Sequence, residues 1–189
     1  MILKRGLIVF LLVVIVFSVC GVQWKTLESD IAGWEDLQPG DILFVDIHEG
    51  WCHGGFWDHV AIYVGVSEQT YGIASVVEAT FNAGVVPTPI SEFLSRDEPA
   101  KLAARRLTRE AGDKEIVQKA VDYALAQVGK PFDFTVHLTT VPHKINENYL
   151  HCSELVWRAY KAAGVDIDSN DGLLIYPDDI YFSPKLEPI

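Results

Sequence analysis

Residues 150–164 read LHCSELVWRAYKAAG, a stretch that combines a helical pattern with a cysteine near its start. Apolar side chains recur every three or four positions, which predicts a helix from Cys152 to Ala163 that ends at Gly164. The first turn of a helix offers unpaired backbone N–H groups and a positive dipole end, and both stabilise a thiolate. Cys152 is therefore a candidate nucleophile. The alternative, from position alone, is a small buried thiol that packs beneath the helix.

The segments before this helix predict a sheet and a second helix. Runs rich in β-branched and aromatic residues, several of them introduced by Gly or Pro turns, predict strands. These runs are residues 42–47, 59–66, 73–80, 85–86 and 101–107. Residues 113–128 have an apolar face with helical spacing, and Gly129 and Pro131 follow as they commonly do at helix ends. Strands flanked by helices predict an α+β fold, an antiparallel sheet packed with helices.

The strand HVAIYVGV at residues 59–66 begins with a histidine. Alternate side chains of a strand share a face, so His59 lies on the face of Ala61 and Tyr63. The valines and the isoleucine between them then face the core. This pattern describes one buried face and a second face of smaller residues that carries an imidazole. His59 is therefore the candidate general base for the thiol.

Glu78 lies in the next predicted strand, within the apolar sequence VVEAT. An acid in such a strand needs a partner. Neighbouring strands are about 4.8 Å apart, so its carboxylate can reach the distal nitrogen of His59 and fix the imidazole tautomer. The alternative is a carboxylate at an exposed strand edge. Together, Cys152, His59 and Glu78 form a plausible catalytic group.

Five segments resemble a known family when they are taken together: LQPGDILFV, DHVAIYVG, VVEAT, GKPFDF and HCSELVWRAY. In this order they are similar to the circularly permuted papain-like branch of the NlpC cysteine-peptidase superfamily, the YiiX-like proteins. The resemblance covers residues 37–183. In ordinary papain-like enzymes the cysteine helix precedes the histidine strand, whereas in the permuted branch the histidine comes first. This chain has the permuted order His59, Glu78, Cys152.

The resemblance implies a permuted papain-like fold over residues 25–189 and a thiol hydrolase with Cys152 as nucleophile, His59 as base and Glu78 as the third polar residue. A thioacyl intermediate would form and would then be released to water, an amine or an alcohol. Relatives in the wider superfamily cleave peptidoglycan peptides or other amides, or transfer lipid acyl groups. We therefore expect a cell-envelope amidase or peptidase that needs no cofactor and no metal. The alternatives are a lipid thioesterase or acyltransferase that uses the same residues, and a non-catalytic binding module.

Composition excludes other classes of protein. The chain has 189 residues, of which 49% are hydrophobic and 22% charged, enough for one domain with a sizeable core. Its formal net charge is −11, from 26 acidic and 15 basic residues, which argues against a nucleic-acid partner. Three cysteines are too few for a disulfide scaffold.

The amino-terminal residues 1–24 predict a membrane segment. Lys4 and Arg5 precede the stretch Gly6–Trp24, which carries no charge. As a helix this stretch is roughly 28 Å long, just enough to cross a bilayer. The leading basic residues place the amino end in the cytoplasm and the domain outside. An uncleaved anchor, a cleaved secretory signal and lipidation at Cys20 all remain open.

A glycine-rich stretch, HEGWCHGGFWDH, precedes the predicted histidine strand. His48, Cys52, His53 and His59 crowd together in it and raise the possibility of a zinc site. However, the spacing fits no standard zinc finger, and adjacent Cys52 and His53 rarely point at one metal. The favoured interpretation is a loop whose aromatic residues line a substrate groove, the alternative being that they cap the core.

The remaining polar candidates have mainly structural interpretations. Asp58 alternates to the strand face opposite the neighbouring histidine, so a direct role in the triad is disfavoured. His151 is expected to begin the cysteine helix rather than to act as a second base. His137 and His143 fall in a loop and are expected at the surface. Asp41 of the PGD sequence is expected to hold a turn.

Overall fold

The computed structural model describes residues 35–46, 55–95, 101–137, 144–145 and 147–189. The elements in chain order are β1 (Ile42–Asp46), β2 (His59–Gly65), β3 (Ser75–Thr80), β4 (Gly84–Pro89), α2 (Ile90–Ser95), β5 (Lys101–Leu107), α3 (Lys114–Ala126), the 3-10 helix η1 (Phe134–His137), α4 (Cys152–Ala162), α5 (Pro177–Tyr181) and β6 (Leu186–Pro188). All of them belong to the unit Gln38–Ile189.

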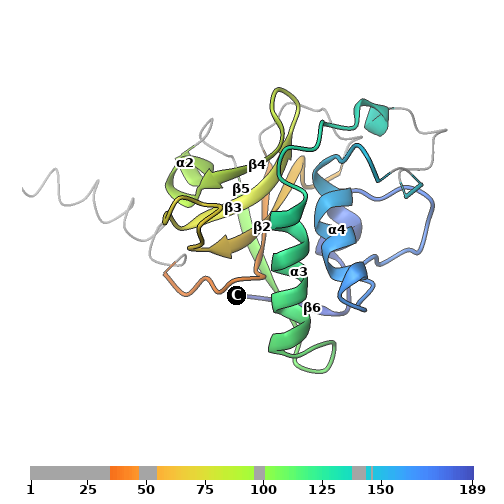
Figure 1. Cartoon of the computed structure of the whole chain (residues 1–189). Helices are drawn as coiled ribbons and strands as arrows, with labels where there is room; N and C mark the ends of the chain where they lie inside the picture. The colour runs from red at the N-terminus through yellow and green to blue at the C-terminus, as the bar shows by residue number, and fades with distance from the viewer. Residues whose placement is uncertain (1–34, 47–54, 96–100, 138–143, 146) are drawn as a thin grey trace, which may run out of the picture. The chain divides into compact units, whose positions relative to one another are not determined.

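The described strands form one sheet in the order β4-β3-β2-β1-β5-β6, and every neighbouring pair is antiparallel. Helices α3 and α4 lie side by side against this sheet (Figure 1). The predicted α+β class, an antiparallel sheet packed with helices, is confirmed. The short helices α2 and α5 and the strand β6 were not anticipated, because each has too few residues to show a period in the sequence.

Strand β4 is longer than predicted, since it continues through Pro87 and Pro89. The prolines are tolerated because β4 is an edge strand and their missing N–H groups belong to its outer side. Val85 shows which side of β4 is the outer one. Its backbone N–H donates to the Lys130 carbonyl oxygen and its carbonyl oxygen accepts the Gly129 N–H, both at 2.8 Å. Alternate residues of a strand direct their N–H groups to the same side, so those of positions 87 and 89 would also face outward. The residues that follow α3 therefore cover this edge at Val85, and Pro87 and Pro89 disfavour further strand pairing along it.

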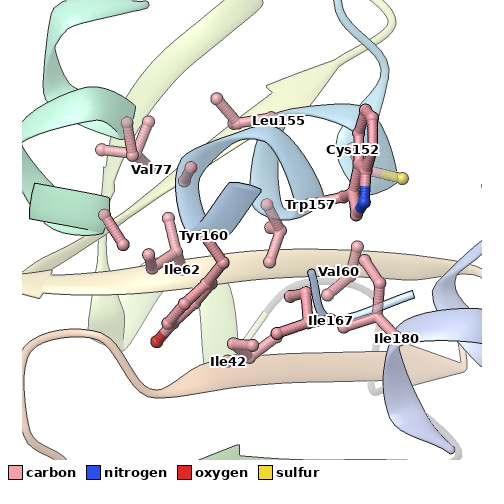
Figure 2. Close-up of a cluster of buried hydrophobic side chains, with 14 of the residues drawn as sticks. Ile42, Val60, Ile62, Val77, Cys152, Leu155, Trp157, Tyr160, Ile167 and Ile180 are labelled. Carbon is pink, nitrogen blue, oxygen red and sulfur yellow. The ribbon is translucent and has the colours of Figure 1, made fainter. Parts of the chain in front are cut away.

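One hydrophobic core joins the helices to the sheet (Figure 2). Strand β2 supplies Val60, Ile62 and Val64, the residues that alternation assigns to the inner face, and strands β1 and β3 add their own apolar residues. Helix α4 contributes Leu155, along with other residues of its apolar face. Figure 2 shows Cys152 at the start of α4, at the margin of this cluster. Burial of the helix thus fixes the position of the cysteine.

The turn before β1 is tied to α4. Gly40 has a φ of +96°, which a residue with a side chain adopts only with strain, and a Cβ there would overlap Val117 of α3. The Tyr160 hydroxyl on α4 donates to the Gly40 carbonyl oxygen. Asp41 accepts two hydrogen bonds of 2.7 Å from the Arg106 guanidinium on β5. Asp41 therefore holds the turn, as predicted.

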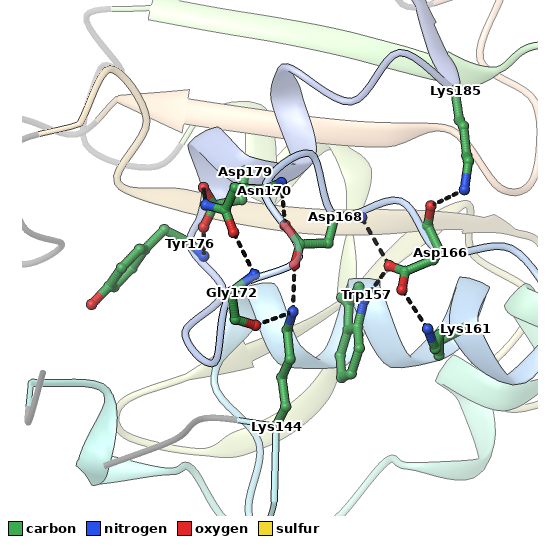
Figure 3. A network of polar contacts seen from close by, with 10 residues as sticks. All are labelled: Lys144, Trp157, Lys161, Asp166, Asp168, Asn170, Gly172, Tyr176, Asp179 and Lys185. Atoms are coloured by element: carbon green, nitrogen blue, oxygen red, sulfur yellow. Dashed lines mark hydrogen bonds and ion pairs between the residues drawn. The ribbon is translucent and has the colours of Figure 1, made fainter. Parts of the chain in front are cut away.

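The segment that follows α4 is held by a polar network (Figure 3). The Trp157 indole N–H donates to the Asp166 carboxylate at 2.8 Å, and Lys161 pairs with the same carboxylate. The Lys144 ammonium donates to the fully buried Asp168 carboxylate and to the Gly172 carbonyl oxygen. Lys144 comes from the segment before α4, so this network links that segment to the one that follows the helix.

The predicted amino-terminal segment 1–24 and the domain boundary near residue 25 lie outside the described residues. Within the part of the chain that is described, no helix is both long and apolar enough to span a bilayer.

Candidate active site

Cys152 is the first residue of α4, as predicted, and 4% of its surface is exposed. Helix α4 begins here because His151 is extended, with φ −92° and ψ 174°, and because Glu154 accepts the His151 backbone N–H at 3.3 Å. His151 is itself buried and serves as the N-terminal cap residue of the helix, in agreement with the sequence prediction. Cys152 therefore lies in the first turn of α4, whose backbone N–H groups have no partner within the helix.

His59 begins β2, next to the start of α4. The segment just before it is anchored by Asp178 of α5, whose carboxylate accepts the backbone N–H groups of Phe56 at 2.9 Å and of Trp57 at 3.0 Å. The Asp58 backbone N–H then donates to the Val45 carbonyl oxygen at 3.0 Å and extends the pairing of β2 with β1. These contacts fix the backbone from which the imidazole projects.

Glu78 lies within hydrogen-bond distance of His59, because the His59 Nε2 and Glu78 Oε2 atoms are 2.7 Å apart. The Glu78 side chain is fully buried, whereas 16% of the His59 side chain is exposed. The other carboxylate oxygen, Oε1, accepts a hydrogen bond of 2.5 Å from the Thr88 hydroxyl on β4. The carboxylate is thus held from both sides, with Oε2 facing the imidazole and Oε1 facing Thr88.

The sheet register explains why these side chains meet. Pairing of β2 with β3 begins at Ile62, opposite Val77, so the first three residues of β2 lie beyond the paired region. If this register is continued, Glu78 lies two residues along β3 from the position opposite His59, so the two side chains are diagonal neighbours on one face of the sheet. In the same way Thr88 lies two residues along β4 from Val86, the partner of Glu78. The backbone N–H of Val60, in the part of β2 that does not pair with β3, hydrogen-bonds to the Cys152 sulfur.

Cys152 and His59 change each other's protonation. Burial opposes a charge on His59, but hydrogen bonds to Cys152 and Glu78 outweigh it and raise the His59 pKa from 6.5 to about 10. Burial also disfavours the Cys152 thiolate, yet the hydrogen bond and charge of His59, with smaller help from Ser153 and the Val60 backbone, lower the thiol pKa below its usual 9.0. Since Glu78 takes Nε2, Nδ1 is the imidazole nitrogen that faces the thiol. The favoured state is a thiolate–imidazolium pair.

The other sequence candidates have the following places in the structure. Nε2 of His59 bonds to Glu78 and not to Asp58. His48, Cys52, His53 and His143 lie outside the described residues, so the structure does not test the zinc alternative or the groove loop, while His137 ends η1. Among the described residues, no group of three or more His, Cys, Asp or Glu side chains is arranged to hold a metal ion.

Two further residues support the site and were missed from the sequence. Thr88 follows Pro87, which obscured the strand that carries it, although its position ten residues after Glu78 fits a hairpin. Asp178 lies far along the chain from the loop it holds, and no local pattern links the two. A short helix start with Pro at its first position, PDDIY, was its only sequence signal.

The antiparallel sheet packed with helices, with the histidine strand before the cysteine helix, is the arrangement of a permuted papain-like fold. Residues 36–176 match the model of a family described as permuted papain-like amidase enzymes, YaeF/YiiX, C92 family. The chain belongs to this family of papain-like amidases, which confirms the resemblance seen in the sequence.

The chain is also similar to individual proteins. The chain is 39% identical over 84 residues to an uncharacterised Bacillus subtilis protein, YycO, a match that covers 38% of this chain and 33% of that protein. The chain thus spans about a third of the length of this curated relative. A crystal structure of the metalloprotein YiiX from Escherichia coli O157:H7 superposes with a TM-score of 0.62 at 21% identity, covering 80% of this chain and 96% of that one. This likeness concerns the fold.

Proposed function

We propose that the protein hydrolyses amide bonds with Cys152 as nucleophile, His59 as general base and acid, and Glu78 as the residue that orients the imidazole. The observation that carries the proposal is the hydrogen bond of 2.7 Å from His59 Nε2 to Glu78, combined with the opposed pKa changes of His59 and Cys152. A thiol and an imidazole that share a proton in this way generate a nucleophile near neutral pH.

The chemistry follows from the ion pair. The Cys152 thiolate adds to the carbonyl carbon of the amide, and the oxygen takes the negative charge. The imidazolium of His59 gives its proton to the leaving nitrogen, the C–N bond breaks, and an amine and a thioester on Cys152 remain. Neutral His59 then removes a proton from water, which attacks the thioester and releases the acid. The thiolate–imidazolium pair is restored.

The developing oxyanion needs hydrogen-bond donors, and α4 supplies them. The backbone N–H groups of its first turn have no partner within the helix, and Cys152 lies in that turn. A carbonyl oxygen placed there as the sulfur attacks would accept these N–H groups and face the positive end of the helix. Such donors are commonly worth several kcal/mol of transition-state stabilisation.

A second candidate uses the same residues on an acyl lipid, with an alcohol or amine as the acceptor. The apolar stretch Gly6–Trp24 favours it, because a membrane segment would keep the domain near lipid. We also propose that the membrane segment, preceded by Lys4 and Arg5, places the domain outside the cytoplasm and retains it at the membrane, where it acts on an envelope substrate. The alternative is release of the domain after cleavage of this segment. Fractionation of cells into membrane and soluble material, with protease access from outside, tests this location.

The proposed function is tested by amide hydrolysis with the full chain and single variants. Cys152→Ala and Cys152→Ser should each abolish turnover, and His59→Asn should reduce it by several orders of magnitude. Cys52→Ala is the matched control and should retain activity. A fatty acyl adduct on Cys152, in place of a peptidyl or other amide-derived adduct, would favour the lipid alternative. Turnover that survives in Cys152→Ala would exclude the proposed nucleophile.

A further inference from the structure

The segment before the nucleophile is held by the chain that follows α3. The Leu150 N–H donates to the Pro131 carbonyl oxygen, and the Leu150 carbonyl oxygen accepts the Asp133 N–H, both at 3.2 Å. Phe132, between these two partners, forms a parallel bridge with Leu150, which is itself fully buried. The chain is therefore fixed as far as the residue that precedes the helix cap.

The cap residue, His151, is held by α4 itself. Its carbonyl oxygen accepts the Leu155 N–H at 3.0 Å, and its N–H donates to the Glu154 carboxyl group at 3.3 Å. Of these four hydrogen bonds on residues 150 and 151, three join backbone groups and survive a change of side chain. The fourth depends on the side chain of Glu154, so a substitution there can test what the held backbone does.

The Glu154 side chain is fully buried and has support of its own. Its Oε1 atom lies 3.6 Å from Arg158 Nη2, and Arg158 Nη1 lies 3.3 Å from Glu147 Oε1, in the segment before α4. The Glu154 Oε2 atom is also 3.6 Å from His151 Nε2. Apolar residues of similar size often give equal or greater stability at the positions of a buried ion pair. The retention of Glu154 and Arg158 beside the nucleophile therefore favours a role in positioning.

The position of His151 determines the direction of the Cys152 N–H. The His151 carbonyl and the Cys152 N–H belong to one planar peptide group, so a residue 151 that is held at both its N–H and its carbonyl oxygen fixes that plane. The Cys152 N–H lies in the first turn of α4, without a partner within the helix, on the residue that carries the attacking sulfur. Resting on the proposed function, we infer that Glu154 is a positioning residue that directs the Cys152 backbone N–H toward the oxyanion.

Glu154 serves here as a hydrogen-bond acceptor and not as a charge. Burial raises its pKa from 4.5 to about 8, so the side chain is largely neutral at pH 7. A neutral acid still offers a carbonyl oxygen to the His151 N–H and places no negative charge in the turn where the oxyanion develops. Glu154→Gln keeps such an acceptor oxygen, whereas Glu154→Met keeps the length of the side chain and removes the acceptor.

Two reactions of Cys152 in the full chain distinguish alignment of the N–H from placement of the thiol. Amide hydrolysis passes through an oxyanion, whereas alkylation by iodoacetamide displaces iodide from a carbon atom and needs no oxyanion donor. At pH 7, Glu154→Met should lower kcat for amide hydrolysis about tenfold or more, with KM changed less than about threefold. The rate of alkylation, followed by mass spectrometry on the peptide that contains Cys152, should change less than about threefold. Glu154→Gln should recover most of kcat.

A second variant and a control complete the experiment. Arg158→Met removes the guanidinium beside Glu154 and should give the same difference between the two reactions, with a fall in kcat of about threefold. Glu115→Met is the matched control, because Glu115 is an exposed acidic residue in the first turn of α3, and it should leave both rates unchanged.

An unchanged kcat in Glu154→Met would overturn the inference, as would an equal fall in hydrolysis and alkylation in the two methionine variants, since Glu154 and Arg158 would then serve the fold alone. If circular dichroism shows that Glu154→Met does not fold, the same comparison in Arg158→Met decides. The proposed function fails by a different result: hydrolysis that survives in Cys152→Ala would overturn it whatever these variants show.

Discussion

Replacement of Glu78 by Gln should lower the pKa of His59 and narrow the pH range of activity. The substitution keeps the size of the side chain and a hydrogen-bonding group near Nε2, but it removes the negative charge 2.7 Å from the imidazole. A hydrogen bond to a charged partner is worth about 1 to 1.5 kcal/mol more than a neutral one. At 1.36 kcal/mol per pKa unit, the His59 pKa should fall by about one unit from its value of about 10.

The direction of the effect on activity follows from the ion pair. The imidazolium is present below the raised pKa of His59 and is lost as the pH rises through about 10. The thiolate is present above the lowered pKa of Cys152 and is lost as the pH falls through it. The profile of kcat/KM against pH should therefore be bell-shaped, with its alkaline limb near 10 in the natural protein and near 9 in the variant.

The assay is amide hydrolysis from pH 5 to 11, with titration of the His59 ring signals by NMR as a measurement independent of turnover. Because a neutral amide also stabilises the wrong imidazole tautomer, kcat should fall on the order of 100-fold or more. Glu68→Gln serves as the control for loss of one surface charge. An alkaline limb and a His59 titration that both stay near 10 in Glu78→Gln would refute the role of this carboxylate.

Three further substitutions test the supporting structure. The Thr88 hydroxyl orients the Glu78 carboxylate that faces His59, so Thr88→Val should lower kcat about tenfold and move the alkaline limb of the pH profile. Thr88→Ser keeps the hydroxyl and should restore both. An unchanged pH profile in Thr88→Val would contradict this role. Gly84→Ala should destabilise the fold by about 3 kcal/mol in denaturant unfolding, because φ is positive there and the new Cβ would overlap the Lys130 carbonyl. Gly129→Ala is the control, since Gly129 also has a positive φ but faces open space, and it should cost only about 1 kcal/mol. Equal losses of stability in the two variants would rule out the steric argument. Burial raises the pKa of Glu154 from 4.5 to about 8. The free energy of unfolding that its protonated form contributes is therefore present below pH 4.5 and is lost as the pH rises through 8, by at most about 5 kcal/mol. Glu154→Gln should flatten this decline in stability, and a decline of the same size in the variant would refute the prediction.

The elements with strong local patterns could be predicted from the sequence. Strand β5 and the start of α4 fall where the sequence places them, and α3 begins after Asp113, whose side chain caps it. Alternation along β2 correctly separated the core residues Val60, Ile62 and Val64 from the face of His59. These features depend on periodicity and capping, which neighbouring residues determine.

The parts that could not be predicted depend on contacts between distant segments. The prolines of β4 concealed a strand that tolerates Pro87 and Pro89 because their positions face its outer side, and that property arises only from its place at the edge of the sheet. Asp178 holds the loop before His59 from more than a hundred residues away. A cavity of about 390 Å³ beside Glu78 forms only when β3, β4 and α2 are assembled, so composition and spacing contain no sign of it.

The central claim is that Cys152 carries the acyl group during turnover. Rapid quenching in acid during hydrolysis of a slow amide or ester, followed by proteolysis and mass spectrometry, locates that group directly. We expect an acyl adduct on the peptide that contains Cys152, accumulating and decaying with turnover, and absent in Cys152→Ala. An adduct on Cys52 or on any other residue, or turnover without an adduct under conditions in which deacylation limits the rate, would contradict it.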